Sequence, residues 1–323
     1  MGKLNFRWAI NQALDEEMTR DAKVVLLGED IGRAGGTFGL TRGLYEKYGE
    51  WRVKDSPLSE EGLMGTAVGL AIAGYRPVIE IMFMDFITIA MEQLVNQAAK
   101  TNFVSGGKIT IPLVVRTLGG GGFRGGSHHS QSLEAWFTHV PGLKVVYPSN
   151  PEDAKGLLKS AIRDDHPVLF IEHKSLLSLK GEAPDEEYTI PIGKAKIVCK
   201  GEHLTILSYG KMVHVCLEGA NELEKKGIKA EVIDLRTLLP LDVETIIQSV
   251  KKTNHVLIVH EAAKNSGFGA EISALISEQA IYDLDAPVKR LAGLFSTIPV
   301  GNAEDFLYPT VLQIIQTAEE LVL

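Results

Sequence analysis

The sequence predicts an α/β protein built from two doubly wound domains with mostly parallel sheets. Short aliphatic runs, typical of strands buried on both faces, alternate with segments of helical periodicity. The alternation lapses once, over a polar stretch punctuated by Gly and Pro, and then resumes. A chain of 323 residues has the length of two domains. We therefore expect domains at 1–180 and 201–323, joined by a linker at 181–200.

The elements of the first domain follow from local patterns. Apolar residues recur every fourth position from Phe6 to Met18 with acids between them, which predicts an amphipathic helix. The aliphatic run at 24–27 stops at Gly28-Glu29-Asp30, so this strand carries acid at its carboxyl end. The remaining predictions are helices at 59–73, 86–99 and 151–163 and strands at 77–81, 112–116, 143–147 and 167–171.

The second domain repeats the alternation on a smaller scale. Its predicted strands are 204–209, 230–235, 256–260 and 288–291, and its predicted helices are 212–226, 242–252, 269–280 and 310–321. No internal repeat has the period of a solenoid, so we expect a second α/β unit.

Charge and composition exclude several classes of protein. The chain has 33 Lys and Arg against 41 Asp and Glu, a net charge of −8, and lacks the clustered basic face that nucleic acid requires. No apolar stretch reaches the roughly eighteen residues of a membrane span, and no leader peptide is evident, so we expect a cytoplasmic protein without a membrane partner. Cys199 and Cys216 lack metal-ligand spacing, and we expect buried thiols.

A glycine-rich segment at 119–126 is open to two interpretations. It contains G-x-G-x-x-G at positions 120, 122 and 125, but the next strand does not end in the acid that a dinucleotide-binding fingerprint needs. A surface loop is the alternative. His128 and His129 follow directly, and because neighbours in an extended segment point to opposite sides, at most one faces a given cleft. That histidine would suit acid–base chemistry near neutral pH, and a solvent-exposed pair is the other interpretation.

Two acids are equally ambiguous when taken alone. Glu60 lies at the entry to the predicted helix at 59–73, where an acid complements the helix dipole whether or not it has a chemical role. Glu29 follows the end of a strand, the edge at which α/β sheets place their sites. The local sequence does not show whether Glu29 or Glu60 has a chemical role.

Six ordered blocks together carry a resemblance that runs nearly end to end. They are Leu26-Leu27-Gly28-Glu29-Asp30, Asp55-Ser56-Pro57-Leu58-Ser59-Glu60, Ser105-Gly106-Gly107, His129-Ser130-Gln131-Ser132, Pro141-Gly142-Leu143-Lys144-Val145-Val146 and Asp153-Ala154-Lys155-Gly156-Leu157-Leu158. The chain resembles the beta subunit of the thiamine-diphosphate-dependent decarboxylase component of 2-oxo acid dehydrogenase complexes. This family includes the pyruvate, branched-chain 2-oxo acid and acetoin dehydrogenases. The resemblance implies a pyrimidine-binding domain followed by a smaller transketolase C-terminal-like domain.

The resemblance implies roles for particular residues. Glu60 would hydrogen-bond N1′ of the cofactor aminopyrimidine, a task that suits a carboxyl group in a desolvated setting. Phe86 would stack on the pyrimidine, and Glu29 and Leu58 would complete the cofactor-binding set. His129 would donate or accept a proton while the acyl group passes to a lipoyl arm.

The resemblance also implies partners. The Gly-Asp-Gly motif ending in paired asparagines, which holds magnesium and the diphosphate in this family, does not occur in the chain. An alpha subunit would therefore supply that half of the site in an α2β2 heterotetramer, and the C-terminal domain would dock on a lipoyl acyltransferase core. A possible potassium site would use backbone carbonyls, and its residues would be Leu113, Ala161, Ile162, Asp164 and His166, with His166 in place of an expected Asn.

Three functions compete at this stage. The first is the catalytic beta subunit, with pyruvate favoured as substrate because Trp136 and Phe137 would narrow the acyl pocket, although both suit helix packing equally well. Branched-chain 2-oxo acids and acetoin are the alternative substrates. The second function is a non-catalytic docking scaffold, and the third is a nicotinamide oxidoreductase. The presence of Glu60, Phe86 and His129 together argues against the scaffold.

Overall fold

The computed structural model describes residues 2–184 and 186–322, and they divide into two compact units. The first unit runs to Gly119 and resumes over Trp136–Ile192, and the second comprises Gly120–Ala135 and everything from Gly193 onward. Each predicted domain is continuous in sequence. In the structure, by contrast, the segment Gly120–Ala135 interrupts the first unit and belongs to the second. The α/β class with mostly parallel sheets is confirmed.

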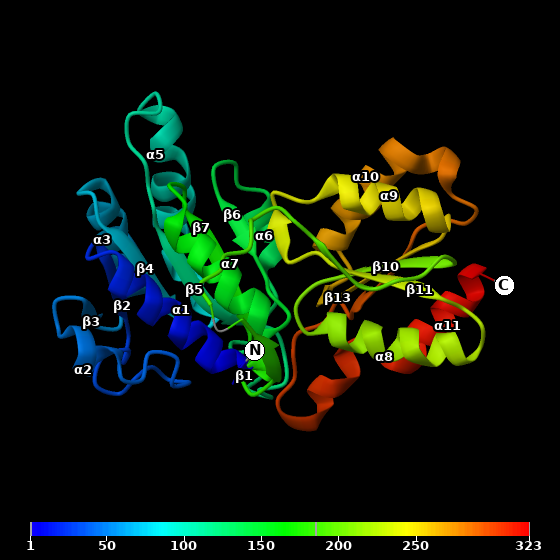
Figure 1. The fold of residues 1–323 in the computed structure, drawn as a ribbon, viewed down its shortest axis with the longest axis horizontal. Coiled ribbons are helices and arrows are strands. Elements are labelled where there is room, and N and C mark those ends of the chain that lie inside the picture. The colour runs from blue at the N-terminus through cyan, green and yellow to red at the C-terminus, as the bar shows by residue number, and fades with distance from the viewer. Residues whose placement is uncertain (1, 185, 323) are drawn as a thin grey trace. The chain divides into compact units, whose positions relative to one another are not determined.

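In the first unit, parallel strands lie in the order β6-β7-β5-β4-β2-β3 (Figure 1). These strands are β2 (Val24–Gly28), β3 (Val53–Asp55), β4 (Arg76–Ile81), β5 (Val114–Gly119), β6 (Lys144–Val146) and β7 (Val168–His173). The helices are α1 (Phe6–Arg20), α2 (Leu44–Tyr48), α3 (Glu60–Ile72), α4 (Met84–Ile87), α5 (Ala99–Val104) and α7 (Pro151–Arg163). The short α6 (Glu134–Thr138) begins in the loop segment and leads back into this unit.

Helices α1 and α7 pack side by side against the sheet and share its core (Figure 1). Phe6, Ile10 and Leu14 of α1 are fully buried there, as the four-residue spacing predicts. Ion pairs also join the two helices, because the Arg163 guanidinium lies 2.6 Å from the Glu17 carboxylate. The first helix of the chain is thereby fixed to the sheet that follows it.

Several features of this unit differ from the sequence prediction, including α2 and β3, which were not predicted. The predicted helix at 86–99 is a series of α4, a 3-10 turn (Thr88–Ala90), the π-helical segment η2 (Glu92–Ala98) and α5. Apolar periodicity over so few residues does not distinguish these segments, since all of them are right-handed helices and differ in which carbonyl each amide bonds to. The predicted linker also contains a strand, β8 (Lys180–Ala183), which pairs antiparallel with β1 (Gly2–Asn5). Their polar sequences carry no strand-like alternation.

The second unit has its own sheet in the order β14-β13-β10-β11-β9, antiparallel only between β9 and β11. The strands are β9 (Lys196–Cys199), β10 (Leu204–Ser208), β11 (Ala230–Asp234), β13 (Val256–Ala263) and β14 (Lys289–Gly293), and β12 (Thr237–Leu239) is a further short strand. Helices α8 (Met212–Lys225) and α11 (Val311–Val322) cover one face, and α9 (Val243–Thr253) and α10 (Phe268–Ala280) cover the other (Figure 1). Two 3-10 segments, η4 (Ile281–Asp283) and η5 (Gly301–Leu307), complete the unit.

A buried ion-pair triad crosses the centre of the first sheet. Arg116 on β5 is 2% exposed, and its guanidinium donates to Glu80 of β4 at 2.9 Å and to Glu172 of β7 at 2.7 and 3.0 Å. A buried guanidinium is tolerated only when its donors are satisfied, and each carboxylate needs the same cation in return. The three neighbouring strands are therefore tied together by charge as well as by their backbone ladders.

Replacing Arg116 with Met should lower the free energy of unfolding by about 3 to 5 kcal/mol, because two carboxylates remain buried without their cation. Urea denaturation followed by circular dichroism measures the loss. Lys47→Met is the matched control, since it breaks an exposed ion pair with Asp15 that is worth less than about 1 kcal/mol. Equal losses in the two variants would contradict the role given to the triad.

Candidate functional site

Three predicted site residues meet at one edge of the first sheet. Glu29 directly follows β2, Glu60 opens α3 shortly after β3, and Phe86 lies on α4 after β4. Strands β3, β2 and β4 are parallel neighbours, so their carboxyl ends share an edge, the usual place for a site in an α/β sheet. Residues that are far apart in sequence are thus brought together by topology.

Glu29 and Glu60 form a buried pair of carboxyl groups. They are 9% and 8% exposed, and burial together with the charge of Glu60 raises the pKa of Glu29. The Oε1 atom of Glu29 is buried without a hydrogen-bond partner among the described residues. A buried acceptor that the chain itself leaves unsatisfied is expected where a ligand supplies the partner. The pair therefore fits a weakly basic heterocycle such as an aminopyrimidine.

Local contacts hold these acids in place. A Cβ at Gly28 would lie 2.9 Å from the Glu80 carbonyl oxygen, so only glycine lets the end of β2 approach β4 this closely. After the turn, the Gly32 amide donates to the Asp55 carboxylate at 2.7 Å, which joins the chain that follows Glu29 to the end of β3. The segment is positioned before any ligand arrives.

The other predicted cofactor residues differ in exposure. Phe86 is half-buried and packs edge-on against Phe83, with ring centroids 5.5 Å apart at 78°. Leu58 is 83% exposed in this chain, so its side chain is open to solvent or to another subunit. Trp136 is likewise exposed and Phe137 is fully buried, which assigns Phe137 to core packing.

His129 lies in the second unit, within the segment Gly120–Ala135. Its ring is half-buried and lies 6.5 Å from the Phe123 ring, and its amide donates to the Gly126 carbonyl at 3.2 Å. His128 is exposed. The expected extended segment is instead a turn over 127–129, and of the two histidines within it only His129 is partly buried. The structure gathers Glu29, Glu60 and Phe86 in one unit and places His129 in the other.

The predicted cation site has two convergent carbonyls. The Nη1 atom of Arg76 donates to the carbonyl oxygens of Ile162 and Asp164 at 3.1 and 3.0 Å, so both oxygens point at a position that this guanidinium nitrogen occupies. The Leu113 carbonyl accepts from Val168 and the Ala161 carbonyl from Asp164. Because a carbonyl has two lone pairs, these bonds leave acceptor capacity for an ion. Occupancy of this site stays a prediction.

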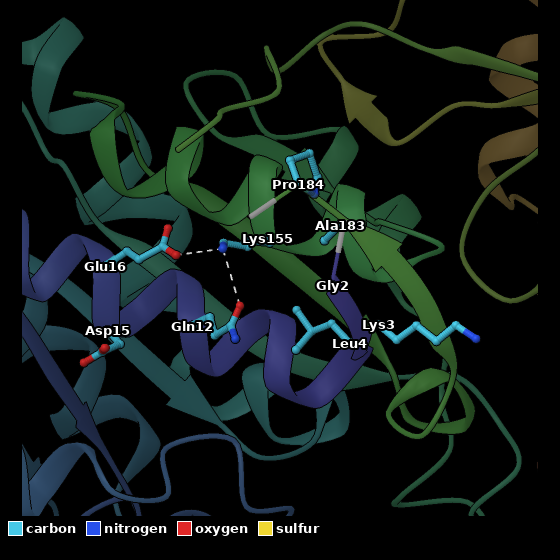
Figure 2. A pocket seen from close by; sticks show the side chains of 9 residues that line it. All are labelled: Gly2, Lys3, Leu4, Gln12, Asp15, Glu16, Lys155, Ala183 and Pro184. Carbon is cyan, nitrogen blue, oxygen red and sulfur yellow. Dashed lines mark hydrogen bonds and ion pairs between the residues drawn. The ribbon is translucent and has the colours of Figure 1, made fainter. Parts of the chain in front are cut away.

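A surface pocket of about 360 Å³ lies elsewhere on the first unit (Figure 2). Figure 2 shows Lys155 pointing into it between Glu16, at 2.7 Å, and Gln12, at 3.4 Å. The ammonium is therefore already neutralised, and the pocket includes none of the predicted site residues. Over 2–184 and 186–322, no three His, Cys, Asp or Glu side chains are grouped to hold a metal, and no helix is long and apolar enough to cross a membrane.

Sequence reasoning missed a set of buried acids in the second unit. Glu134, Glu261 and Glu304 are 1%, 7% and 0% exposed, and they come from α6, β13 and η5. Tyr209 donates to Glu134 at 2.7 Å, yet burial dominates and raises the pKa of Glu134 to about 7. The three are separated by up to 170 positions in the sequence, so no local motif signals them.

Glu134 should make stability depend on pH. Its carboxyl group has an ordinary pKa of 4.5 when unfolded and about 7 when folded, so the folded state binds the proton more tightly. Its contribution to stability is complete below about pH 4.5 and is lost as the pH rises to about 7, a total of about 3 kcal/mol. Glu134→Gln, which keeps an acceptor for Tyr209, should remove this loss. Urea unfolding of both proteins from pH 5 to 8 measures the difference, and parallel curves would contradict it.

Comparison with known proteins agrees with this architecture. A family model described as "Transketolase, pyrimidine binding domain" matches residues 2–180, and one described as "Transketolase, C-terminal domain" matches 193–314. Among solved structures, a split-gene transketolase described as an inactive beta4 tetramer has a TM-score of 0.81 at 22% identity, and the similarity covers 99% of each chain. At that identity the comparison supports the fold alone.

Three curated relatives are much more similar in sequence. The 2-oxoisovalerate dehydrogenase subunit beta of Bacillus subtilis is 50% identical over 91% of this chain and 90% of its own. The beta subunit of acetoin:2,6-dichlorophenolindophenol oxidoreductase from Cupriavidus necator is 46% identical over 98% and 97%. The pyruvate dehydrogenase E1 component subunit beta of Bacillus subtilis is 45% identical over 100% and 99%. The chain therefore belongs to the transketolase-like family of beta subunits of 2-oxo acid dehydrogenase E1 components, as its sequence motifs predict.

Proposed function

We propose that this chain forms half of a thiamine-diphosphate site that decarboxylates a 2-oxo acid oxidatively and transfers the acyl group to a lipoyl arm. The observation that carries the proposal is the buried Glu29 and Glu60 pair at the carboxyl edge of the first sheet, with one acceptor left unsatisfied. Family membership supports the same cofactor. The cofactor supplies the electron sink for loss of carbon dioxide.

Glu60 is the group that holds the pyrimidine proton. Its position at the start of α3, buried beside Glu29, lets its carboxyl group share a proton with a ring nitrogen of low basicity. Phe86 provides an apolar face near this edge, and burial together with the charge of Glu60 raises the pKa of Glu29. The chain's own residues thus set the tautomer and orientation of the pyrimidine.

His129 is the proton donor or acceptor for acyl transfer. It is half-buried in a glycine-rich loop, and a neutral imidazole carries one nitrogen that donates a proton and one that accepts it. The two predicted catalytic residues, Glu60 and His129, belong to different units of the chain. Decarboxylation and acyl transfer are therefore served by separate residues that can be tested separately.

The remaining half of the site comes from an alpha subunit. The chain lacks the Gly-Asp-Gly motif, and its described residues offer no cluster of metal-ligating side chains, so the alpha subunit would hold magnesium and the diphosphate. The assembly would be an α2β2 heterotetramer on a lipoyl acyltransferase core. In this proposal the carbonyls of Leu113, Ala161, Ile162, Asp164 and His166 bind potassium, and the oxygens of Ile162 and Asp164 do so in addition to accepting from the Arg76 guanidinium. The free thiols of Cys199 and Cys216 suit the reducing cytoplasm.

Pyruvate is the proposed substrate, and a branched-chain 2-oxo acid is the second candidate. The relative at 50% identity is named for 2-oxoisovalerate, whereas relatives at 44 to 45% are named for pyruvate. Assembly with the alpha subunit, followed by assays with pyruvate, 3-methyl-2-oxobutanoate and acetoin and an artificial electron acceptor, separates the three. Turnover of none of them, with assembly intact, would favour the docking scaffold.

Glu60→Gln should abolish decarboxylation in the assembled enzyme, lowering kcat by at least about a hundredfold, because an amide cannot share the required proton. Release of carbon dioxide from labelled substrate measures the loss. Glu61→Gln is the control, since Glu61 is the exposed neighbour on the same helix. Near-normal activity of Glu60→Gln, with the control also active, would overturn the assignment.

His129→Ala should impair acyl transfer to lipoamide by about a hundredfold more than it impairs decarboxylation. The two rates are compared in one preparation, with lipoamide and then an artificial acceptor as the oxidant. His128→Ala, which removes the exposed neighbour, should leave both rates near normal. Equal losses of the two activities in His129→Ala would refute the role proposed for this histidine.

A further inference from the structure

The glycine-rich loop is held by buried acids of its own unit. The backbone amide of Gly121 donates to the Glu261 carboxylate, and the amide of Gly122 donates to Oε1 of Glu304. Charge-assisted bonds of this kind are stronger than bonds between neutral groups. Two successive amides of the loop are therefore fixed by acids from two distant elements, β13 and η5.

Glu304 holds the loop at a second point, beside His129. Its Oε2 accepts from the hydroxyl of Ser130 at 3.1 Å, and both side chains are 0% exposed. One carboxylate thus bridges Gly122 before the histidine and Ser130 directly after it. In the described part of the chain, the donors to the buried Glu304 carboxyl group are the Gly122 amide and the Ser130 hydroxyl, both from the loop. A buried carboxyl group is costly unless hydrogen bonds satisfy it, and here the loop supplies them.

Glycine is required where the loop meets these acids. A Cβ at Gly121 would lie 2.4 Å from the Tyr308 hydroxyl oxygen and 2.6 Å from Oε1 of Glu304. Any larger residue would therefore push the amide away from its carboxylate. The polyglycine run is explained by this close approach, and neither a dinucleotide nor a freely mobile surface loop is needed.

The outer part of the loop is joined to the same segment. Arg124 binds Asn302 and Asp305 at 2.7 Å each, and its carbonyl accepts from the Gly301 amide at 3.1 Å. The Ser127 hydroxyl donates to the Ile298 carbonyl at 2.9 Å. Each of these exposed contacts contributes little to stability by itself. Together they hold the outer part of the loop against residues 298–305.

We propose that Glu304, assisted by Glu261, is a positioning residue that fixes the loop so that His129 presents its imidazole for acyl transfer. The inference rests on the function proposed for His129 and extends it to the second unit. The two acids act on the backbone that carries the imidazole, and an error of about 1 Å in such a group is enough to slow a reaction about a hundredfold.

Hydrogen exchange tests whether Glu304 anchors the loop at 120–130, and it requires no measurement of enzyme activity. In the full chain, Glu304→Ala should speed amide exchange of peptides covering 120–130 by about tenfold, the factor expected when one charge-assisted hydrogen bond is lost. Glu319→Ala is the matched control, because Glu319 lies in the same unit and pairs with Lys226 instead of the loop. Unchanged exchange over 120–130 in Glu304→Ala would overturn the anchor. If the alanine variant does not fold, amide exchange over 120–130 is measured in Glu304→Gln, which keeps one hydrogen-bond acceptor.

A double-mutant cycle tests the action through His129. In the assembled enzyme, Glu304→Gln should lower the ratio of the lipoamide rate to the decarboxylation rate by about tenfold, and adding His129→Ala should give no further loss beyond His129→Ala alone. If the losses in Glu304→Gln and His129→Ala were additive in the double variant, or if Glu304→Gln lowered both rates equally, the role of Glu304 would be merely structural and the proposal would be overturned. If exchange quickens while His129→Ala itself is unselective, the proposed role of His129 fails and the anchor remains. The two failures are therefore distinguishable.

Discussion

The interaction on which the first unit depends is the buried guanidinium of Arg116 between Glu80 and Glu172. It joins β4, β5 and β7 at the middle of the sheet, where no water can compensate an unpaired charge. The alignment of β4 with β2 then decides where their carboxyl ends lie, and with them Glu29 and the helix that carries Phe86. The buried ion-pair triad thus aligns the strands whose ends carry the candidate site residues Glu29 and Phe86.

Glutamate has several different roles in this chain, and the surroundings of each side chain decide its role. Glu172 is satisfied by a cation, Glu29 is buried with an acceptor unsatisfied, and Glu304 receives only donors from the loop it holds. A carboxyl group keeps its proton or its charge according to the partner that burial gives it. The sequence alone shows 41 acids and cannot assign these partners.

The fold was predictable because it depends on local pattern, whereas the candidate site residues came from the family resemblance. Aliphatic runs predicted the parallel strands, and the resemblance, which includes the block at 55–60, pointed to Glu60, which is buried beside Glu29. The strands β1 and β8 were not predictable, since their pairing joins polar segments about 180 residues apart. The acids beneath the glycine loop were missed for the same reason: Gly122 and Glu304 are separated by 182 positions.

The glycine-rich loop belongs to the second unit, although it follows a strand of the first. A loop that follows a strand of the first unit would be expected to belong to that unit, yet its amides are satisfied by acids of the second. A backbone segment adopts the surroundings that satisfy its hydrogen-bonding groups, and here these are two carboxylates reached only through glycine. The second unit therefore holds the loop that carries His129 through its own acids, Glu261 and Glu304.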